Sequence, residues 1–155
     1  MAITDYEYSD SRSQSWRTVE KEITFSGGTA DAIGDFDGTG NPFSIFAVTG
    51  TVRAKIYAIC ETTLVGASAT LEVGNSKNTA GIIAQSTATD IAVNEIWHDA
   101  SPDAAVELDS VAAENILANG LDVIGTVGTA NITAGKIKFI CLWRPVSLDA
   151  DVSSA

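Results

Sequence analysis

The sequence predicts an all-β protein, and three observations support this fold class. Several short apolar segments alternate with a period of two residues, which is typical of strands that bury one face. Clusters of Gly, Asn, Asp and Ser separate them at intervals of about 8–12 residues, as in antiparallel sandwiches and barrels. No convincing helical period extends over about ten residues. We therefore expect one antiparallel β-sandwich or barrel, of jelly-roll or β-tulip type, over residues 17–146.

Polar segments flank this domain on both sides. Residues 1–16 mix Ser, Asp and Tyr without a sustained period, so we expect an extended N-terminal arm, disordered when free or ordered on a partner. Tyr6, Tyr8 and Trp16 are its predicted partner-binding residues, although Trp16 could instead cap the end of the domain. Residues 147–155 are also polar, and we expect them to form a flexible C-terminal tail.

Residues 17–25 form the first expected strand. Val19, Ile23 and Phe25 share one phase of the alternation, and Lys21 intrudes into that phase. A lysine on the inward phase is tolerated where its side chain can reach water. This strand should therefore be half-buried and lie near the edge of a sheet.

Further strand candidates follow along the chain. The clearest of the first half is the one that contains residues 52–60, where apolar and mixed positions alternate regularly. The last candidate should end at Pro145, which has no N–H to continue a ladder. The candidates are residues 43–50, 51–62, 68–74, 81–85, 93–97, 121–128 and 135–145.

Residues 103–120 leave two possibilities open. Val106 and Leu108 suggest a strand. Residues 110–117 could instead form one or two helical turns that stop at Gly120.

The net charge of −11 arises from twenty acidic and nine basic residues, with no cluster of Lys or Arg. Affinity for nucleic acids comes mainly from basic groups that displace counterions, so no nucleic-acid partner is expected. No apolar run approaches the roughly 20 residues that span a bilayer, and no secretory signal is recognisable at the N-terminus. We therefore expect no membrane partner and synthesis in a cytoplasm.

Cys60 and Cys141 lie far apart, each inside an apolar segment. We expect buried free thiols rather than a disulfide, because a reducing cytoplasm disfavours the bond. Two cysteines and one histidine do not make a zinc site of the usual spacing.

The Gly- and Asp-rich loop over residues 26–42 contains a pattern similar to a calcium loop. Asp35 and Asp37 have the D-x-D spacing, and Gly40 is the sixth position counted from Asp35. The twelfth position is Phe46, so the bidentate Glu of an EF-hand is missing. We expect neither a bound metal nor another cofactor, and Asp35 and Asp37 are the candidate ligands should calcium bind.

His98 is the one histidine of the chain and stands between Trp97 and Asp99. Adjacent side chains of an extended segment point to opposite faces, so His98 and Asp99 should not form a dyad with each other. The following stretch DASPD is typical of a turn. The sequence contains no G-x-S-x-G motif, and no spacing singles out a pair of carboxylates. We expect a structural histidine at a strand end, with Trp97 packed inward, and no catalytic residue or enzymatic activity.

The segment ATLEVGNSKNTAGIIAQSTATDIAVNEIWHDASPDA, over residues 69–104, is one of two that carry a family resemblance. The other is ILANGLDVIGTVGTANITAGKIKFICLWRP, over residues 116–145. They resemble small virion proteins of tailed bacteriophages, the capsid decoration or cement proteins. The resemblance covers about half of the chain and consists of strand-and-turn patterns rather than a catalytic signature.

This resemblance implies a β-sandwich or β-tulip domain, usually trimeric, bound to the outside of the head at three-fold positions. The implied partners are the major capsid protein and further copies of the chain, and the implied location is the capsid exterior of the virion. The net charge fits an external position, because it is unfavourable beside packaged DNA. The expected function is therefore to stabilise the shell.

Two alternatives remain open at this level. One is another non-enzymatic virion component, such as a head fibre, neck or tail module. The other is a carbohydrate-binding sandwich in which Trp16, Trp97 and Trp143 serve as stacking platforms. Trp143 shares the apolar phase of the last strand, which favours a core position for that residue.

Overall fold

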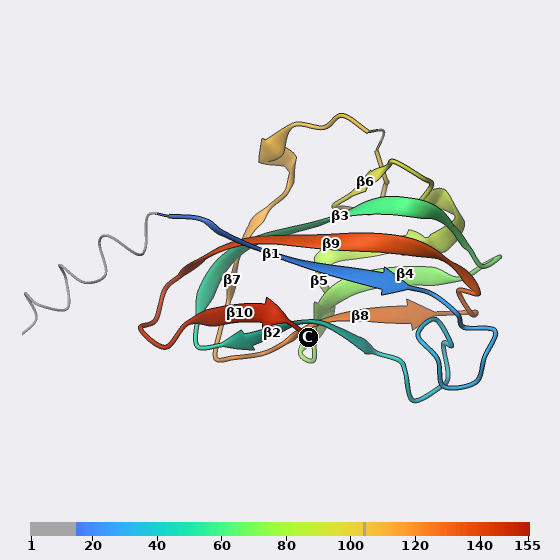
Figure 1. The fold of residues 1–155 in the computed structure, drawn as a ribbon, viewed down its shortest axis with the longest axis horizontal. Coiled ribbons are helices and arrows are strands. Elements are labelled where there is room, and N and C mark those ends of the chain that lie inside the picture. Colours follow the sequence, from blue (N-terminus) through green and yellow to red (C-terminus); the bar gives the residue numbers. More distant parts are fainter. Residues whose placement is uncertain (1–14, 104) are drawn as a thin grey trace, which may run out of the picture.

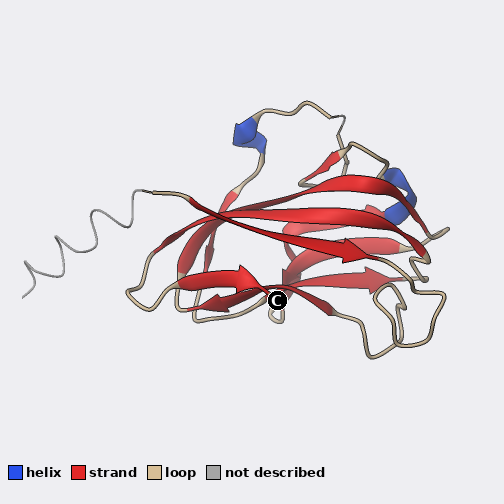
Figure 2. Cartoon of the chain, in the orientation of Figure 1, coloured by secondary structure: helices blue, strands red, loops and turns tan. Residues whose placement is uncertain are grey.

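The computed structural model describes residues 15–103 and 105–155, which form two antiparallel sheets packed face to face (Figure 1 and Figure 2). The prediction of an all-β sandwich is confirmed. The helical elements of the described chain are two 3₁₀ turns, η1 (Ala88–Asp90) and η2 (Asp109–Val111). Neither is long and apolar enough to cross a membrane.

Sheet A has five strands in the order β1-β9-β3-β6, with β7 also paired to β3. β1 lies at its edge, as the inward-phase Lys21 predicts. The Lys21 ammonium donates a hydrogen bond to the backbone oxygen of Ala155 rather than extending only into water. The strands are β1 (Arg17–Thr24), β3 (Val52–Val65), β6 (Ile96–Trp97), β7 (Glu114–Leu117) and β9 (Ala134–Pro145).

Sheet B also has five strands, in the order β10-β2-β8-β4-β5. β4 and β5 form a hairpin, and Asn75 Oδ1 accepts hydrogen bonds from the N–H groups of Lys77 and Asn78 in its turn. The strands are β2 (Phe43–Thr49), β4 (Thr70–Asn75), β5 (Asn78–Thr87), β8 (Val123–Gly128) and β10 (Asp151–Ser154).

The core lies between the two sheets and is built from the inward phase of each strand. β3 and β9 share the longest ladder of sheet A, and Figure 1 shows them side by side along the centre of the molecule. Burial of one large apolar side chain contributes about 1.5–3 kcal/mol, so these two strands anchor the sandwich. Their buried residues are Val52, Ala54, Ile56, Ala58, Cys60, Leu64, Ile137, Phe139, Cys141 and Trp143.

The prediction of a flexible C-terminal tail over residues 147–155 is wrong, because part of this segment forms a strand. β10 pairs with β2 at the edge of sheet B, and its Val152 is buried in the core. The Ala155 N–H donates to the Ile45 carbonyl at 3.1 Å. A single apolar residue in a polar strand gives no period to detect, but the open edge of β2 supplies backbone partners for the segment.

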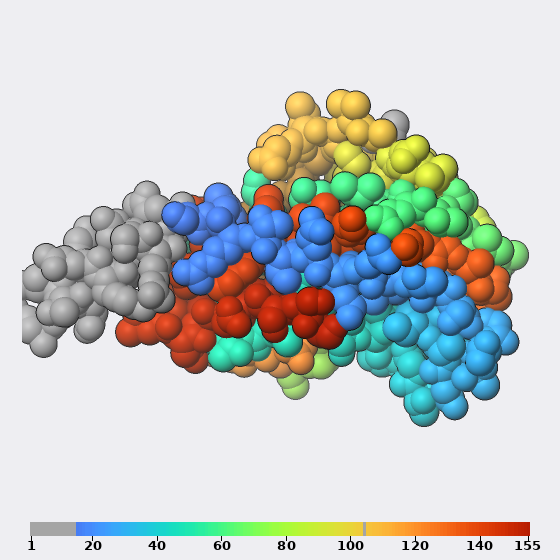
Figure 3. All heavy atoms as spheres, viewed as in Figure 1, coloured from blue at the N-terminus to red at the C-terminus, as the bar shows by residue number. Residues whose placement is uncertain are grey.

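Residues 103–120, for which the sequence allows either a strand or helical turns, divide into two parts in the structure. β7 and the single turn η2 lie in its second half, whereas Val106 and Leu108 lie outside any strand and are 90% and 70% exposed. Residues 105–113 stand out as a ridge along the top of the molecule in Figure 3. The strand expected over residues 93–97 shortens to β6, because Asn94 adopts a positive φ of 68° that interrupts the extended backbone.

Both cysteines are free and buried, as predicted. Cys60 of β3 lies opposite Ile137 in the ladder, and Cys141 of β9 lies opposite Ile56. Burial raises the pKa of the Cys60 thiol to about 11 and that of Cys141 to about 12. These thiols are therefore inert side chains of the core rather than reactive groups.

The raised thiol pKa values predict a loss of stability at alkaline pH. The unfolded chain releases these protons near the ordinary pKa of 9.0, whereas the folded chain holds them to about 11 and 12. The stabilisation is therefore fully present below pH 9 and falls as the pH rises toward those values. Urea midpoints measured from pH 7 to pH 11 should decline more steeply for the wild type than for the Cys60→Ala, Cys141→Ala double variant. Equal declines would contradict this prediction.

Candidate functional site

Two Trp-Arg pairs hold Trp16 and Arg17, where the predicted N-terminal arm meets β1, against β9. Arg17 opens β1 and lies opposite Trp143 of β9 in the antiparallel register. The Arg17 guanidinium carbon lies 4.8 Å from the centroid of the Trp143 ring. The Arg144 guanidinium carbon lies 4.4 Å from the centroid of the Trp16 ring. Each segment thus supplies one ring and one cation, and the two pairs are reciprocal.

These contacts hold Trp16 at the surface in a defined position. Each cation–π contact contributes about 0.5–1 kcal/mol where it is exposed. Arg144 also forms an ion pair with Glu114 of β7, with Nη2 and Oε1 3.2 Å apart. Trp16 remains 38% exposed, so a partner can still reach the ring.

The other predicted partner-binding residues, Tyr6 and Tyr8, lie outside the described residues. The role of Trp16 as a partner contact stays a prediction. The structure shows that its ring packs against the Arg144 guanidinium. Sequence reasoning missed this pairing. The sequence feature that could have indicated the pairing is the dipeptide Trp-Arg, which occurs at residues 16–17 and again at residues 143–144. An antiparallel pairing of two such dipeptides places each ring beside the other strand's cation.

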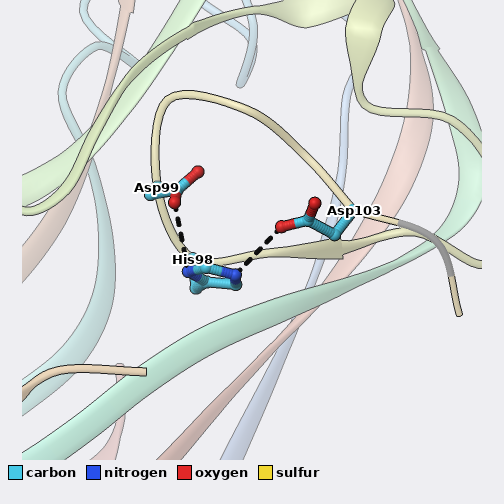
Figure 4. A group of neighbouring side chains, drawn as sticks. All are labelled: His98, Asp99 and Asp103. Carbon is cyan, nitrogen blue, oxygen red and sulfur yellow. Dashed lines mark hydrogen bonds and ion pairs between the residues drawn. The ribbon is translucent and has the colours of Figure 1, made fainter. Parts of the chain in front are cut away.

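His98 lies between two carboxylates (Figure 4). Its Nε2 is 3.1 Å from Oδ2 of Asp103, and its Nδ1 is 3.6 Å from Oδ2 of Asp99. The imidazole is 7% exposed, whereas the two carboxylates are 41% and 56% exposed. The backbone of Asp103 forms a two-way bridge with Ile96, which closes the loop at its base. The imidazole therefore ties together both ends of the loop over residues 98–103.

The expectation that Asp99 points away from His98 is wrong. Strand geometry ends at Trp97, and residues 98–101 form bends, so the rule for adjacent side chains of an extended segment does not apply. The Asp99 carboxylate turns back toward the ring and also accepts the Ser101 N–H at 2.7 Å. Asp103 was missed as a partner because only a turn that reverses the chain brings it back to His98.

This group has the residue types of a metal site, since one atom from each of His98, Asp99 and Asp103 lies within 4.8 Å of the others. The two carboxylates face different nitrogens of one imidazole (Figure 4), whereas a single ion binds only one ring nitrogen. The arrangement is better suited to holding the loop than to holding an ion. Within the described contacts of the imidazole there is no nucleophile for it to activate.

Asp35 and Asp37 differ in their surroundings. Asp35 is 7% exposed, and its Oδ2 accepts the N–H of Asp31 at 2.8 Å. Asp37 is exposed. The Thr39 N–H donates to Asp31 and lowers the pKa of that carboxyl. The Asp35 carboxylate, at the first position of the calcium pattern, thus already accepts a hydrogen bond within the loop. The expectation that no metal binds at Asp35 and Asp37 stays a prediction.

A hollow of about 180 Å³ lies beside the His98 loop. Tyr57, Ile96 and His98 line one side, and residues between 107 and 112 line the other. Pockets for small-molecule ligands usually enclose about 300–1,000 Å³, so this hollow is small for such a role.

Trp97 and Trp143 are 0% and 3% exposed. Both belong to the core, as predicted, so neither ring can stack on a sugar. Of the three tryptophans, only Trp16 presents its ring to solvent. This removes most of the reason for the carbohydrate-binding alternative.

Comparisons with known proteins give one structural likeness. No protein-family model matches the sequence, and no curated protein matches it. Among solved structures, the chain is similar to a chain in the acidic stable capsid structure of Helicobacter pylori bacteriophage KHP30. The TM-score is 0.46 and the sequence identity is 11%, over 90% of this chain and 94% of that chain.

Proposed function

We propose that this chain is a structural protein of a tailed-phage head, which decorates the outside of the shell at three-fold positions as a homotrimer and stabilises it. The sequence resemblance to cement proteins supports this proposal. The two resembling segments, residues 69–104 and 116–145, supply all of β4, β5, β6, β8 and β9. They therefore contribute strands to both sheets of the sandwich.

The observation that carries the proposal is the anchored root of the arm. A protein that holds neighbouring subunits together needs a rigid body and a segment that reaches another subunit. Here Trp16 and Arg17 pack against Arg144 and Trp143 of β9, so the described start of the proposed arm is fixed at the end of sheet A. Ordering an arm on a partner costs conformational entropy, which a large contact area offsets.

Charge supports an external position. With a net charge of −11, each copy would be repelled by DNA packaged inside a head. On the outer surface this charge meets solvent and helps to keep particles apart. Several weak footprints on one lattice raise the overall affinity by about 10²–10⁴, so no single footprint has to be strong.

The direct test is binding to heads that lack this protein. Purified chain should co-sediment with such heads, reach saturation, and raise the temperature at which they release DNA. A glycan array probed with the same preparation should show no binding. Failure to bind the heads, or glycan binding without head binding, would contradict the proposal.

A further inference from the structure

We infer that the outer face of sheet A is the surface on which a second copy of this chain docks. This face consists of the side chains of β1, β3, β7 and β9 that point away from the core. The inference deepens the homotrimer proposed above and rests on that self-association.

The centre of the face is apolar. Tyr57 of β3 and Ile140 of β9 lie opposite each other in the register, while Ile59 and Leu142 lie two residues further along their strands, in opposite directions. All four are half-buried, and Tyr57 also lines the hollow beside residues 107–112, so that segment covers the part of the face next to β3. Ile116 of β7 adds a side chain that is 68% exposed. An apolar centre with a polar rim is the usual anatomy of a protein–protein interface.

The rim carries both signs of charge. Five of the nine basic residues of the chain lie on this face, and most of them form ion pairs with acids of the same face or of the ridge above it. Lys136 lies 2.7 Å from Glu22, Lys138 3.1 Å from Glu61, and Lys55 3.3 Å from Asp109. The basic residues are Arg53, Lys55, Lys136, Lys138 and Arg144.

The opposite face differs in charge. The five strands of sheet B contain no Lys or Arg and do contain Glu72 and Asp151. The strands of sheet A, by contrast, balance their acids with these bases. A neighbouring copy, which also carries −11, is repelled least at this near-neutral face.

Arg53 is the cation that this face leaves free. It is exposed and lies opposite Arg144 in the β3–β9 register, a like-charge pairing that destabilises a sheet. Within the described residues, no carboxylate lies at ion-pair distance from Arg53. A second copy of an acidic chain is a partner that can supply that carboxylate. Because the face carries both signs, it can pair with acids and bases of a neighbouring copy. In a three-fold ring this contact is heterologous, so the neighbour meets the face with a different part of its own surface.

The test compares two charge reversals in the full chain. Arg53→Glu lies on the face, and Lys77→Glu, in the β4–β5 turn, changes the net charge equally. Sedimentation equilibrium over a concentration series should give a multiple of 16.1 kDa for the wild type and for Lys77→Glu. Arg53→Glu should weaken self-association by more than about tenfold, because it places a like charge opposite the partner's carboxylate. Measured at concentrations where the wild type is also dissociated, its melting temperature should be unchanged or higher, since the repulsion with Arg144 is removed.

A second pair of variants covers the case in which Arg53→Glu fails to fold. Ile140→Asp places a charge at the apolar centre of the face, and Ile124→Asp places one at a half-buried outward position of sheet B. The first should dissociate the copies and the second should not. A monomeric wild type, or a folded face variant that associates as tightly as its control, would overturn the inference. Head binding by a monomeric chain would overturn it as well and leave the proposed head-binding function standing.

Discussion

Trp97→Ala is expected to lower the free energy of unfolding by about 3–5 kcal/mol, the range for removal of a large aromatic residue from a core. Trp97 is 0% exposed and packs edge-on against Phe139, with ring centroids 6.3 Å apart. Its Nε1–H donates to Ser86 Oγ at 2.7 Å, and Ser86 is itself buried. The substitution therefore leaves both a cavity and a buried hydroxyl without its donor.

Urea denaturation measures this effect, and two variants serve as controls. Trp97→Phe keeps much of the ring volume and loses the N–H, so its cost should be clearly smaller. Trp16→Ala removes the same side chain at a surface position and should cost about 1 kcal/mol or less. A Trp97→Ala protein as stable as the Trp16→Ala protein would show that β6 does not contribute to the core as described.

Removal of residues 1–16 is expected to abolish binding to heads and to leave the sandwich folded. The arm contains none of the described strands, and its Trp16 ring rests on Arg144 at the surface of the domain. Circular dichroism should therefore be that of the intact domain, whereas co-sedimentation with heads should be abolished.

The matched control for this truncation is Trp16→Ala in the full chain. If the Trp-Arg pairs set the direction of the arm, this variant should bind heads more weakly than the wild type and more tightly than the truncated chain. Head binding by the truncated chain at wild-type affinity would contradict the role proposed for the arm.

The sandwich was predictable because strands that bury one face leave a period of two in the sequence. The alternation predicted over residues 52–60 corresponds to the inward face of β3, and Trp143 is buried on the inward face of β9, as its phase predicts. Lys21 on the inward phase of β1 marks a sheet edge. β10 was not predictable, because only Val152 in that strand is apolar. Its strand conformation depends on an open edge of β2, which no local pattern reveals.

The sites were less predictable than the fold. The contacts of His98 with Asp99 and Asp103 depend on a chain reversal just after β6 ends. Side chains alternate between two faces only in an extended strand, so the sequence pattern does not reveal these contacts. The outer face of sheet A depends on register, which brings residues such as Tyr57 and Ile140 together from distant parts of the sequence. Composition gives the net charge but not its distribution between the two faces.

The central claim is that the chain acts as a repeated structural part of a phage shell. The most direct measurement is its copy number in purified particles, from quantitative mass spectrometry against the major capsid protein. A shell protein at three-fold positions should be present in hundreds of copies per particle. A dozen copies or fewer would place it in the neck or tail, and absence from the particles would contradict a structural role in the virion.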